Sequence, residues 1–579
     1  MVARAECISS RPRLMSILAL FFVLSCMGCR EAYRYEIMDD QQGPLPADPI
    51  IEDPADEPPP PITGWPTPSL HLKRLTQAQY RTLIRSVFGE SVTLSAPLPR
   101  DLEVDGSRAL GTTLSTLTDR EVEQYARAAE EIAEQVVSTP EILALFDLCV
   151  ARVSLLSAPE DDQALLDVKD CLEAVGSSMM SQLWGRALSA EEETRLSALM
   201  IDGWRVFDLP VEALSLSLSW ALQSPHFLFR VERLTEDQAL LDPHTLAERL
   251  SYFLHNSPPD EQLRVAGDAL HSRAEWRRHV ERLLRSPRLE QGVRALFDDM
   301  WSLWRVETLH LSKDPELFEH LSAQLGPSAR EETLMGVWRL TEEDAPLSEL
   351  FTRRETYVDA KLASIYGVPA PAREGFGWTR LSERESRLGI LGQVSFLALN
   401  SHPTSTSSTL RGQFVLDRFL CSPPPPPPSG VDTSIPEPTP DRPTLRDRLE
   451  SHLEEPTCAG CHRSMDMIGL VYEGFDAIGR SRRFEQGVEI DPRGELLGEA
   501  VSGPVELAHA LAQHPKLAPC LTKRVFRYAR GIYASEEELH LIDRHSESVE
   551  QGEFTLKTLL MEIALSEGFH GPFIDQEGE

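Results

Sequence analysis

The sequence predicts a mainly α, multi-domain protein, and three observations support this fold class. Its 579 residues are too many for one hydrophobic core. The apolar–polar alternation typical of strands is scarce, and residues 484–503 are the best candidate for a small β-hairpin, because Pro492-Arg493-Gly494 favours a turn. Capping boxes, in which two side chains satisfy the unpaired amides of a helix start, precede several runs with helical apolar spacing. They pair Thr76 with Gln79, Thr118 with Glu121, Ser189 with Glu192 and Ser535 with Glu538.

Residues 1–29 are predicted to be a signal peptide with a lipobox. Arg11 and Arg13 precede the apolar run 17–24, which is too short to span a bilayer. Cys26 or Cys29 follows and would be the acylated residue. A plain cleaved signal peptide and an uncleaved anchor are the alternatives. The lipobox interpretation predicts a cell-envelope protein, either a periplasmic or an outer-membrane lipoprotein.

The net charge of −34 limits the possible partners. A chain this acidic is repelled by phosphate backbones and by anionic lipid headgroups. We therefore expect no nucleic-acid binding, and we expect any attachment to a membrane to need the lipid anchor. The acidic, proline-rich segment 30–69 follows the signal peptide and is predicted to be a spacer, because it has too few apolar groups to order itself.

Helical periodicity begins at Leu72 and predicts a body of several helical domains. Leu72, Leu75, Tyr80 and Val87 share one face of the first helix. Further helices are expected at 211–234 (interrupted by Pro225), 244–255, 274–286, 289–304, 316–340 and 383–399, and the six prolines 423–428 form a polyproline rod. The predicted domains are three helical ones at 70–138, 139–236 and 237–380, one with the rod and a cysteine motif at 381–485, and a C-terminal helical one at 486–579.

Cys458-Ala459-Gly460-Cys461-His462 is a c-type haem attachment motif. Two thiols at this spacing meet the two haem vinyl groups, and the adjacent histidine reaches the iron. The motif predicts haem c as cofactor, His462 as proximal iron ligand and a cytochrome c-like helical segment. A local or redox disulfide and half of a zinc site are the alternatives. The flanking sequence offers neither a second ligand pair nor a thioredoxin-like context.

The sixth iron ligand is left open by the sequence. Met465 and Met467 follow His462 too closely to reach the opposite haem face. The candidates are His402, His509 and His514, or an open position. Ligation by two histidines would give a lower potential than ligation by histidine and methionine.

Four further cysteines lie beyond the signal peptide and outside the haem motif. Cys149 with Cys171, and Cys421 with Cys520, are the pairings predicted for disulfides in an oxidising compartment.

Several stretches from residue 72 almost to the end resemble the large exported proteins described as planctomycete cytochrome c-like, which consist of a fixed series of domains of unknown function. The resemblance implies the fold class and haem binding. Two departures are that Met467 replaces the proline usual after the haem motif, and that a separate N-terminal haem module is missing. The matching stretches are RLTQAQYRTLIRSVFG (74–89), WGRALSAEEETRL (184–196), ALQSPHFLFRVE (221–232), LAERLSYFLHNSPPDEQL (246–263), RLGILGQVSFLALNSHPTSTSSTLRGQFVLDRFLCSPPPPPP (387–428) and CAGCHRSMDMIGLVYEGFDAIGRSRR (458–483).

Residues 470–483 admit two interpretations. In the first, Tyr472 and Phe475 pack on a haem face, and the haem propionates are neutralised by Arg480, Arg482 and Arg483. In the second, the run is a core turn with a solvated basic edge.

Three functional hypotheses follow. The first is an exported lipoprotein with a single c-type haem, acting in electron transfer or as the redox subunit of an oxidative enzyme system, with an unidentified redox partner protein. The second is a structural or binding lipoprotein whose CxxC is a disulfide. The third is an enzyme with its catalytic site in residues 180–400 and the haem as its electron outlet, although no nucleophile or base is identified in that body.

Overall fold

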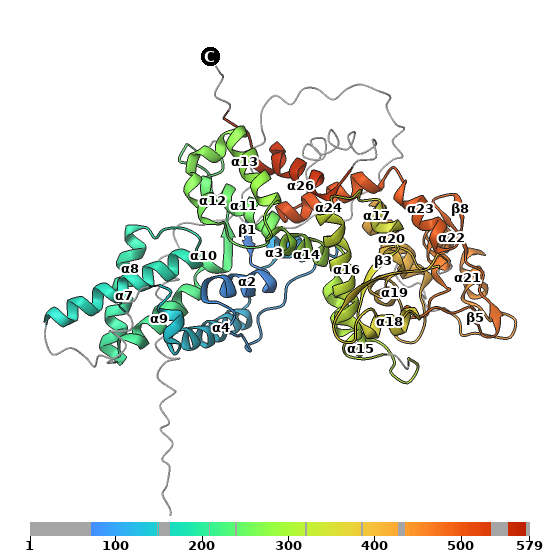
Figure 1. Cartoon of the computed structure of the whole chain (residues 1–579), viewed down its shortest axis with the longest axis horizontal. Helices are drawn as coiled ribbons and strands as arrows, with labels where there is room; N and C mark the ends of the chain where they lie inside the picture. Colours follow the sequence, from blue (N-terminus) through green and yellow to red (C-terminus); the bar gives the residue numbers. More distant parts are fainter. Residues whose placement is uncertain are drawn as a thin grey trace, which may run out of the picture. The chain divides into compact units, whose positions relative to one another are not determined.

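The computed structural model describes residues 71–146, 149, 162–207, 209–237, 240–318, 321–383, 386–425, 435–454, 456–533 and 554–574 (Figure 1). At 162–167, 450–454, 456–458 and 461 it describes the backbone only. The predicted lipidation sites Cys26 and Cys29, the spacer 30–69, the cap Ser535/Glu538 and prolines 426–428 lie outside these residues. Residues 1–64 form one unit and residues 65–579 another, and the fold below belongs to the second.

The chain is mainly α, as predicted, with four two-stranded antiparallel sheets among the described residues. The capping boxes at Thr76 and Thr118 are confirmed. Ser189 and Glu192 also bond reciprocally through backbone and side chain. The N-terminal elements are β1 (Leu72–Arg74), α2 (Gln77–Phe88), α3 (Arg108–Leu114), α4 (Asp119–Val137), α5 (Pro140–Leu143), α7 (Asp162–Leu183), α8 (Ala190–Phe207), α9 (Pro210–Gln223), α10 (Pro225–Leu228) and β2 (Phe229–Val231).

Two expectations for this region are wrong. Leu72 is not on the buried helical face but half-exposed in β1, where it pairs with Val231 of β2. The apolar run 211–234 breaks at Pro225 as predicted, but it is not helical to residue 234. It divides into α9, the single turn α10 and strand β2, because Pro225 cannot donate to the preceding turn and instead starts α10.

The next region packs around α14 and α16. Its elements are α11 (Pro243–His255), α12 (Glu261–Ala266), η2 (Gly267–His271), α13 (Arg273–Leu284), α14 (Leu289–Met300), η3 (Leu303–Thr308), α15 (Leu309–Ser312), α16 (Leu325–Glu342), α17 (Glu349–Thr352), β3 (Glu355–Val358), α18 (Ala360–Tyr366), β4 (Gly377–Arg380), η4 (Ile390–Gly392) and α19 (Val394–Leu399).

The predicted helices 244–255 and 274–286 correspond to α11 and α13, whereas three others are shorter than expected. The helix at 289–304 ends at Met300, and Ser302 has a left-handed φ of 52°. The helix at 316–340 starts only at Leu325, because Pro327 is tolerated in a first turn but not in a helix interior. Among the described residues of 383–399, only those of η4 and α19 are helical. Gly389 has φ 53° there, and a Cβ on it would lie 2.2 Å from the carbonyl oxygen of Phe351.

The last region contains the cysteine motif. Its elements are α20 (Ser408–Leu420), α21 (Leu445–Glu454), α22 (Pro456–Gly469), η5 (Leu470–Tyr472), β5 (Phe484–Glu485), β6 (Val488–Glu489), β7 (Arg493–Leu496), β8 (Glu499–Ser502), α23 (Pro504–Ala512), α24 (Leu517–Arg530), α26 (Leu556–Leu565) and α27 (Glu567–His570).

Residues 484–503 form two hairpins rather than the single one expected. Their turns are Gln486-Gly487 and Leu497-Gly498, and all four residues have positive φ, as tight two-residue hairpin turns require. Pro492-Arg493-Gly494 is therefore not a turn but leads into β7.

Both predicted disulfides, Cys149–Cys171 and Cys421–Cys520, are present. The second connects the end of α20 to α24.

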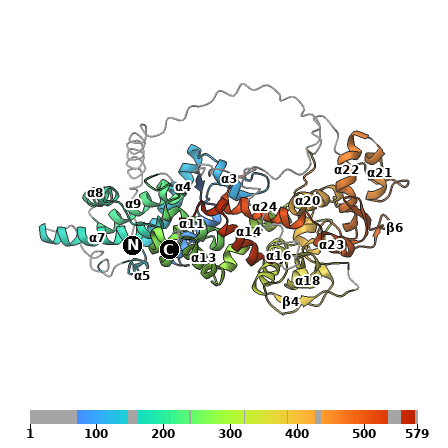
Figure 2. The same ribbon diagram turned by 90° about the horizontal axis from the view of Figure 1, so that it is seen from above.

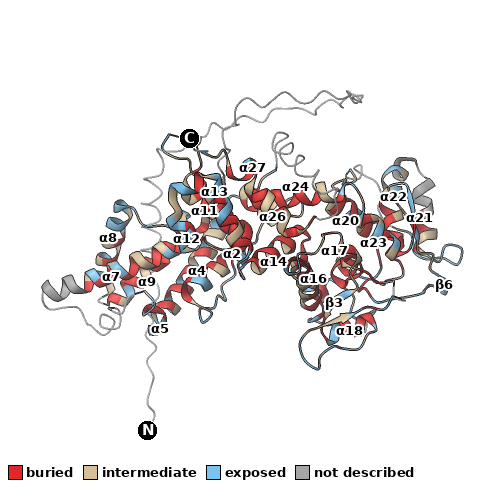
Figure 3. Cartoon of the chain, turned by 45° about the horizontal axis from the view of Figure 1, so that its top comes forward, coloured by how far each residue is buried: buried red, intermediate tan, exposed pale blue. Residues whose placement is uncertain are grey.

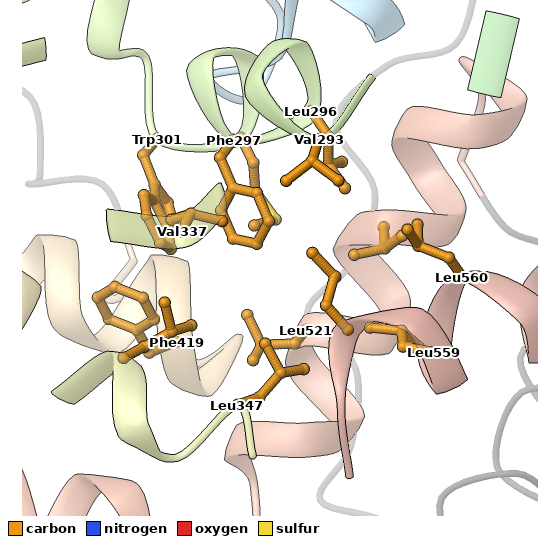
Figure 4. Packing of buried hydrophobic residues seen from close by; sticks show 14 of the residues in the cluster. Val293, Leu296, Phe297, Trp301, Val337, Leu347, Phe419, Leu521, Leu559 and Leu560 are labelled. Atoms are coloured by element: carbon orange, nitrogen blue, oxygen red, sulfur yellow. The ribbon is translucent and has the colours of Figure 1, made fainter. Parts of the chain in front are cut away.

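Buried apolar residues form one cluster within 75–252 and a larger one within 241–569. In the larger cluster α14, α16, α24 and α26 face one another through side chains such as Phe297, Val337, Leu521 and Leu560 (Figure 4). Figure 3 shows the buried faces of α14, α20 and α24. Among the described residues, no helix is both long enough and apolar enough to cross a bilayer.

Candidate functional site around helix α22

The cysteine motif lies entirely within helix α22. Positions 458, 461 and 462 stand at i, i+3 and i+4, so the backbone places them on one face of the helix. The side chains of Cys458 and Cys461 are outside the described residues, whereas that of His462 is described and is 27% exposed. This spacing is compatible with one group attached at all three positions.

His462 is held by a carboxylate one turn further along the helix. Its Nδ1 lies 2.9 Å from Oδ2 of Asp466, which is fully buried. This hydrogen bond, together with the negative charge of Asp466, raises the pKa of His462. A carboxylate that accepts from one ring nitrogen fixes the tautomer and makes the other nitrogen, Nε2, the more basic donor to a metal.

Asp466 is itself fixed by helix α20. Thr409 Oγ1 donates to its Oδ1 at 2.6 Å, and Ser408 Oγ lies 3.5 Å from the same oxygen. Two hydroxyl groups of α20 thus orient the carboxylate that contacts the histidine. Motif analysis identified His462 but missed Asp466, although an acidic residue four positions after the histidine is visible in the sequence. No sequence signal pointed to Thr409.

Glycines allow α20 and α22 to approach closely enough for these contacts (Figure 2). A Cβ on Gly412 of α20 would lie 1.8 Å from the carbonyl oxygen of Met465, and a Cβ on Gly469 of α22 would lie 1.8 Å from that of Ser408. Each helix therefore presents a glycine to the backbone of the other, and the hydroxyl groups of α20 come within reach of Asp466.

The proximal half of a haem site fits these residues, because the attachment positions share a helix face and the histidine has an oriented carboxylate partner. The candidates for the opposite side are not brought to His462. His402 and His509 are exposed, and the half-buried His514 accepts from the backbone amide of Lys516. In the part of the chain that the structure describes, no hydrogen bond, ion pair or ring contact joins any of the three to His462.

The run 470–483 is a core turn, which agrees with the second of its two interpretations. Tyr472 and Phe475 are buried, and Tyr472 packs edge-on against Phe396 with ring centroids 5.3 Å apart. Arg482 donates to Glu473 at 2.6 Å. Arg480 and Arg483 are exposed at the edge, where Arg483 pairs with Glu489 at 2.9 Å.

Arg411 of α20 holds this turn from inside and was missed by sequence analysis. It is fully buried and donates to the carbonyl oxygens of Tyr472 at 2.8 Å and Asp476 at 2.9 Å. Burial lowers its pKa to about 10, although Glu473 at 3.8 Å opposes this shift. Helix α20 thus fixes both α22 and the turn that follows it.

Four family models match the chain in tandem, and each is described as a protein of unknown function. They are DUF1587 at residues 73–138, DUF1592 at 241–368, DUF1588 at 387–485 and DUF1585 at 497–569. Helix α22 lies within the third match. A search of the curated proteins found no match, and neither did a search of the solved structures.

Proposed function

We propose that this tandem of four domains of unknown function is an exported lipoprotein that carries one c-type haem and acts in electron transfer or as the redox subunit of an oxidative enzyme system. The observation that carries the proposal is the hydrogen bond between His462 and the buried Asp466, next to the CxxCH cysteines. If the cysteines formed an ordinary disulfide, the neighbouring histidine would not require a carboxylate that hydroxyl groups of another helix hold in place.

The residues have separate roles in this proposal. Cys458 and Cys461 would hold the haem through thioether bonds, and His462 would bind the iron from the proximal side. The haem, when bound, supplies one-electron redox chemistry. Asp466 keeps a proton on Nδ1 and orients the imidazole, and its negative charge favours the oxidised, more positive state of the site.

The cell-envelope location has separate support. Disulfides persist in oxidising compartments, and the chain contains two of them. Cys26 or Cys29 would carry the lipid, and the proline-rich segment 30–69 would separate the folded part from the membrane.

The first experiment is to export the protein from a host competent for c-type haem maturation and to record its absorption spectrum and a haem-stained denaturing gel. We expect a covalent haem signal that is lost in Cys458→Ala/Cys461→Ala and kept in His509→Ala. A colourless, well-folded wild-type protein would contradict the proposal and favour a binding lipoprotein whose CxxC is a disulfide.

The role of Asp466 is tested by Asp466→Asn. We expect the haem to stay covalently attached but the reduction potential to rise, because the neutral amide no longer stabilises the oxidised state. Asp202→Asn on α8 is the control, since this carboxylate is exposed and pairs with Arg205 on the same helix. An unchanged reduction potential in Asp466→Asn would refute the proposed role of Asp466 as the partner of the iron ligand His462.

A further inference from the structure

A cavity of about 720 Å³ lies among α2, α3, α11, α14, α16 and α24. Its walls come from three separate stretches of sequence, represented by Gln79, Asp299 and Tyr528, which belong to three of the four matched domains. Helices α3, α14 and α24 meet here, in the middle of Figure 1. The volume is within the range of about 300–1,000 Å³ typical of small-molecule sites, which often form where domains meet.

The lining is rich in positive charge although the whole chain has a net charge of −34. Six arginines line the cavity against four carboxylates, so arginine is in excess. Two of the six are neutralised by ion pairs: Arg294 pairs with Glu331 at 2.5 Å and Arg330 with Asp298 at 2.6 Å.

Three of the other arginines have no carboxylate partner among the described residues. The guanidinium of Arg108 lies 3.6 Å from the ring centre of Trp304, and that of Arg230 lies 4.6 Å from the ring centre of Tyr252. Arg288 donates to Ser257 Oγ at 2.7 Å. The Nε atoms of Arg108 and Arg230 are buried without a hydrogen-bond acceptor, which is costly unless an acceptor enters the cavity.

Among the described residues no carboxylate lies within ion-pair distance of these three arginines, although the charge of Arg108 opposes the rise that burial causes in the pKa of Asp101, and Arg230 acts in the same way on Glu248. Asp299 accepts from Ser107 Oγ at 2.7 Å and from the backbone amides of Arg108 and Ala109 at 2.7 and 3.2 Å. Asp101 accepts from the backbone amide of Gln77 at 3.1 Å. Both acids therefore fix the backbone around the cavity and leave the guanidinium groups available.

A neutral amide adds to the polar lining. Asn256 adopts the left-handed conformation at the end of α11, with φ 49°, and its Oδ1 accepts from Gln79 Nε2 at 2.9 Å. Its amide group is thereby oriented between α2 and α11, where its nitrogen can donate to a ligand.

We propose that this cavity binds a small organic or inorganic oxyanion, a carboxylate or a phosphate, whose oxygens accept from Arg108, Arg230 and Arg288. Arginine suits this task because its planar donors match both groups. The two aromatic rings beneath Arg108 and Arg230 fix the guanidinium planes without consuming their charge. The site is separate from α22 and does not depend on haem.

The test is calorimetric titration of the full exported protein with citrate and, separately, with inorganic phosphate in low-salt buffer. We expect saturable binding of at least one anion. Arg108→Gln and Arg230→Gln should each weaken it about tenfold or more, as expected for the loss of a charge-assisted hydrogen bond. The preferred anion identifies the ligand class.

Arg278→Gln is the matched control, because Arg278 is exposed on α13 and pairs with Glu275 away from the cavity. It should bind like wild type. If Arg108→Gln or Arg230→Gln fails to fold, as judged by thermal melting, Arg288→Gln replaces it, since Arg288 is more exposed. The proposal is overturned if neither anion binds, or if folded cavity variants bind with wild-type or control affinity.

Discussion

Helix α22 and the arginine-lined cavity are built in opposite ways. The groups of the first lie within nine residues of one helix, from Cys458 to Asp466, and a neighbouring helix only orients them. The second joins residues far apart in the chain: Gln79 bonds Asn256 across 177 positions, and Ser107 bonds Asp299 across 192.

The difference explains what each site depends on. The spacing within α22 is fixed by local helix geometry, so we expect it to survive disturbances elsewhere in the molecule. The cavity exists only while three stretches of chain are packed together. Three sets of variants, ordered from the largest expected effect to the smallest, test whether the two sites can be separated in this way.

The largest effect is expected from Glu232→Gln, which acts beside the cavity. Glu232 is buried, 2.7 Å from Lys73 Nζ and 2.8 Å from Arg249 Nε, and so connects β1 to α11. Burial alone would raise its pKa, but Lys73 and Arg249 outweigh this and hold the pKa well below its usual range. The amide would leave two buried cations without a counter-ion, and we expect a loss of about 3–5 kcal/mol in the free energy of unfolding.

Urea denaturation measures this loss, and exposed Glu275→Gln should leave the midpoint unchanged. At temperatures where Glu232→Gln is still folded, we expect anion binding to fall while covalent haem attachment persists. Equal damage to both sites would show that they are not independent.

The second effect is a pH dependence at Asp299. Burial raises its pKa from 3.8 to about 6, despite the bonds from Ser107 and the backbone of Arg108. The folded state therefore holds a proton that the unfolded state has released. The contribution of protonated Asp299 to the free energy of unfolding is fully present below pH 3.8 and is lost as the pH rises through about 6.

Asp299→Asn removes this titration. From pH 4 to pH 7 the variant should gain about 3 kcal/mol relative to wild type, which is the cost of a pKa shift of about two units. Denaturation of both proteins across this range gives the difference at each pH. A difference that stays constant with pH would refute the assignment.

The smallest effect is expected from Gly412→Ala, which acts on α22. The new Cβ would meet the carbonyl oxygen of Met465 at 1.8 Å and force α20 away from α22, at a cost of about 1–3 kcal/mol. Gly336→Ala on α16 is the control, because the one described atom within 4 Å of its Cβ position is Nε2 of Gln393 at 3.9 Å and alanine favours a helix.

Thermal melting should therefore shift down for Gly412→Ala and not for Gly336→Ala. In the haem-loaded protein, Gly412→Ala should also shift the reduction potential in the direction opposite to Asp466→Asn, because a carboxylate that loses the hydrogen bond from Thr409 is more negative and stabilises the oxidised state more strongly. Identical behaviour of the two glycine variants would contradict the helix contact.

The same contrast sets the limits of prediction from the sequence. Capping boxes and apolar spacing act within one or two turns, so the mainly α fold and the caps at Thr76, Thr118 and Ser189 were predictable. Strands β1 and β2 were not, because three residues are too few to display alternation and their pairing is long-range. The late start of α16 follows from Pro327, which is visible in the sequence, whereas the displaced helix start at Gly389 depended on a close backbone contact with Phe351 that no periodicity records.

For the sites, the sequence identified the motif and the cysteine pairs Cys149–Cys171 and Cys421–Cys520. It did not identify Asp466, Arg411 or any residue of the cavity. An arginine without a carboxylate partner looks the same in a sequence as a paired one, so a pocket of this kind becomes visible only in three dimensions.

The disulfide between Cys421 and Cys520 encloses 98 intervening residues, among them the whole of α22. A single backbone cleavage inside this loop would produce two fragments that a non-reducing gel shows as one molecule. Whichever fragment carried α22 would remain attached to the rest through that bond. Proteolysis there would nick the protein without releasing the segment that carries the cysteine motif, until a reductant separated the pieces.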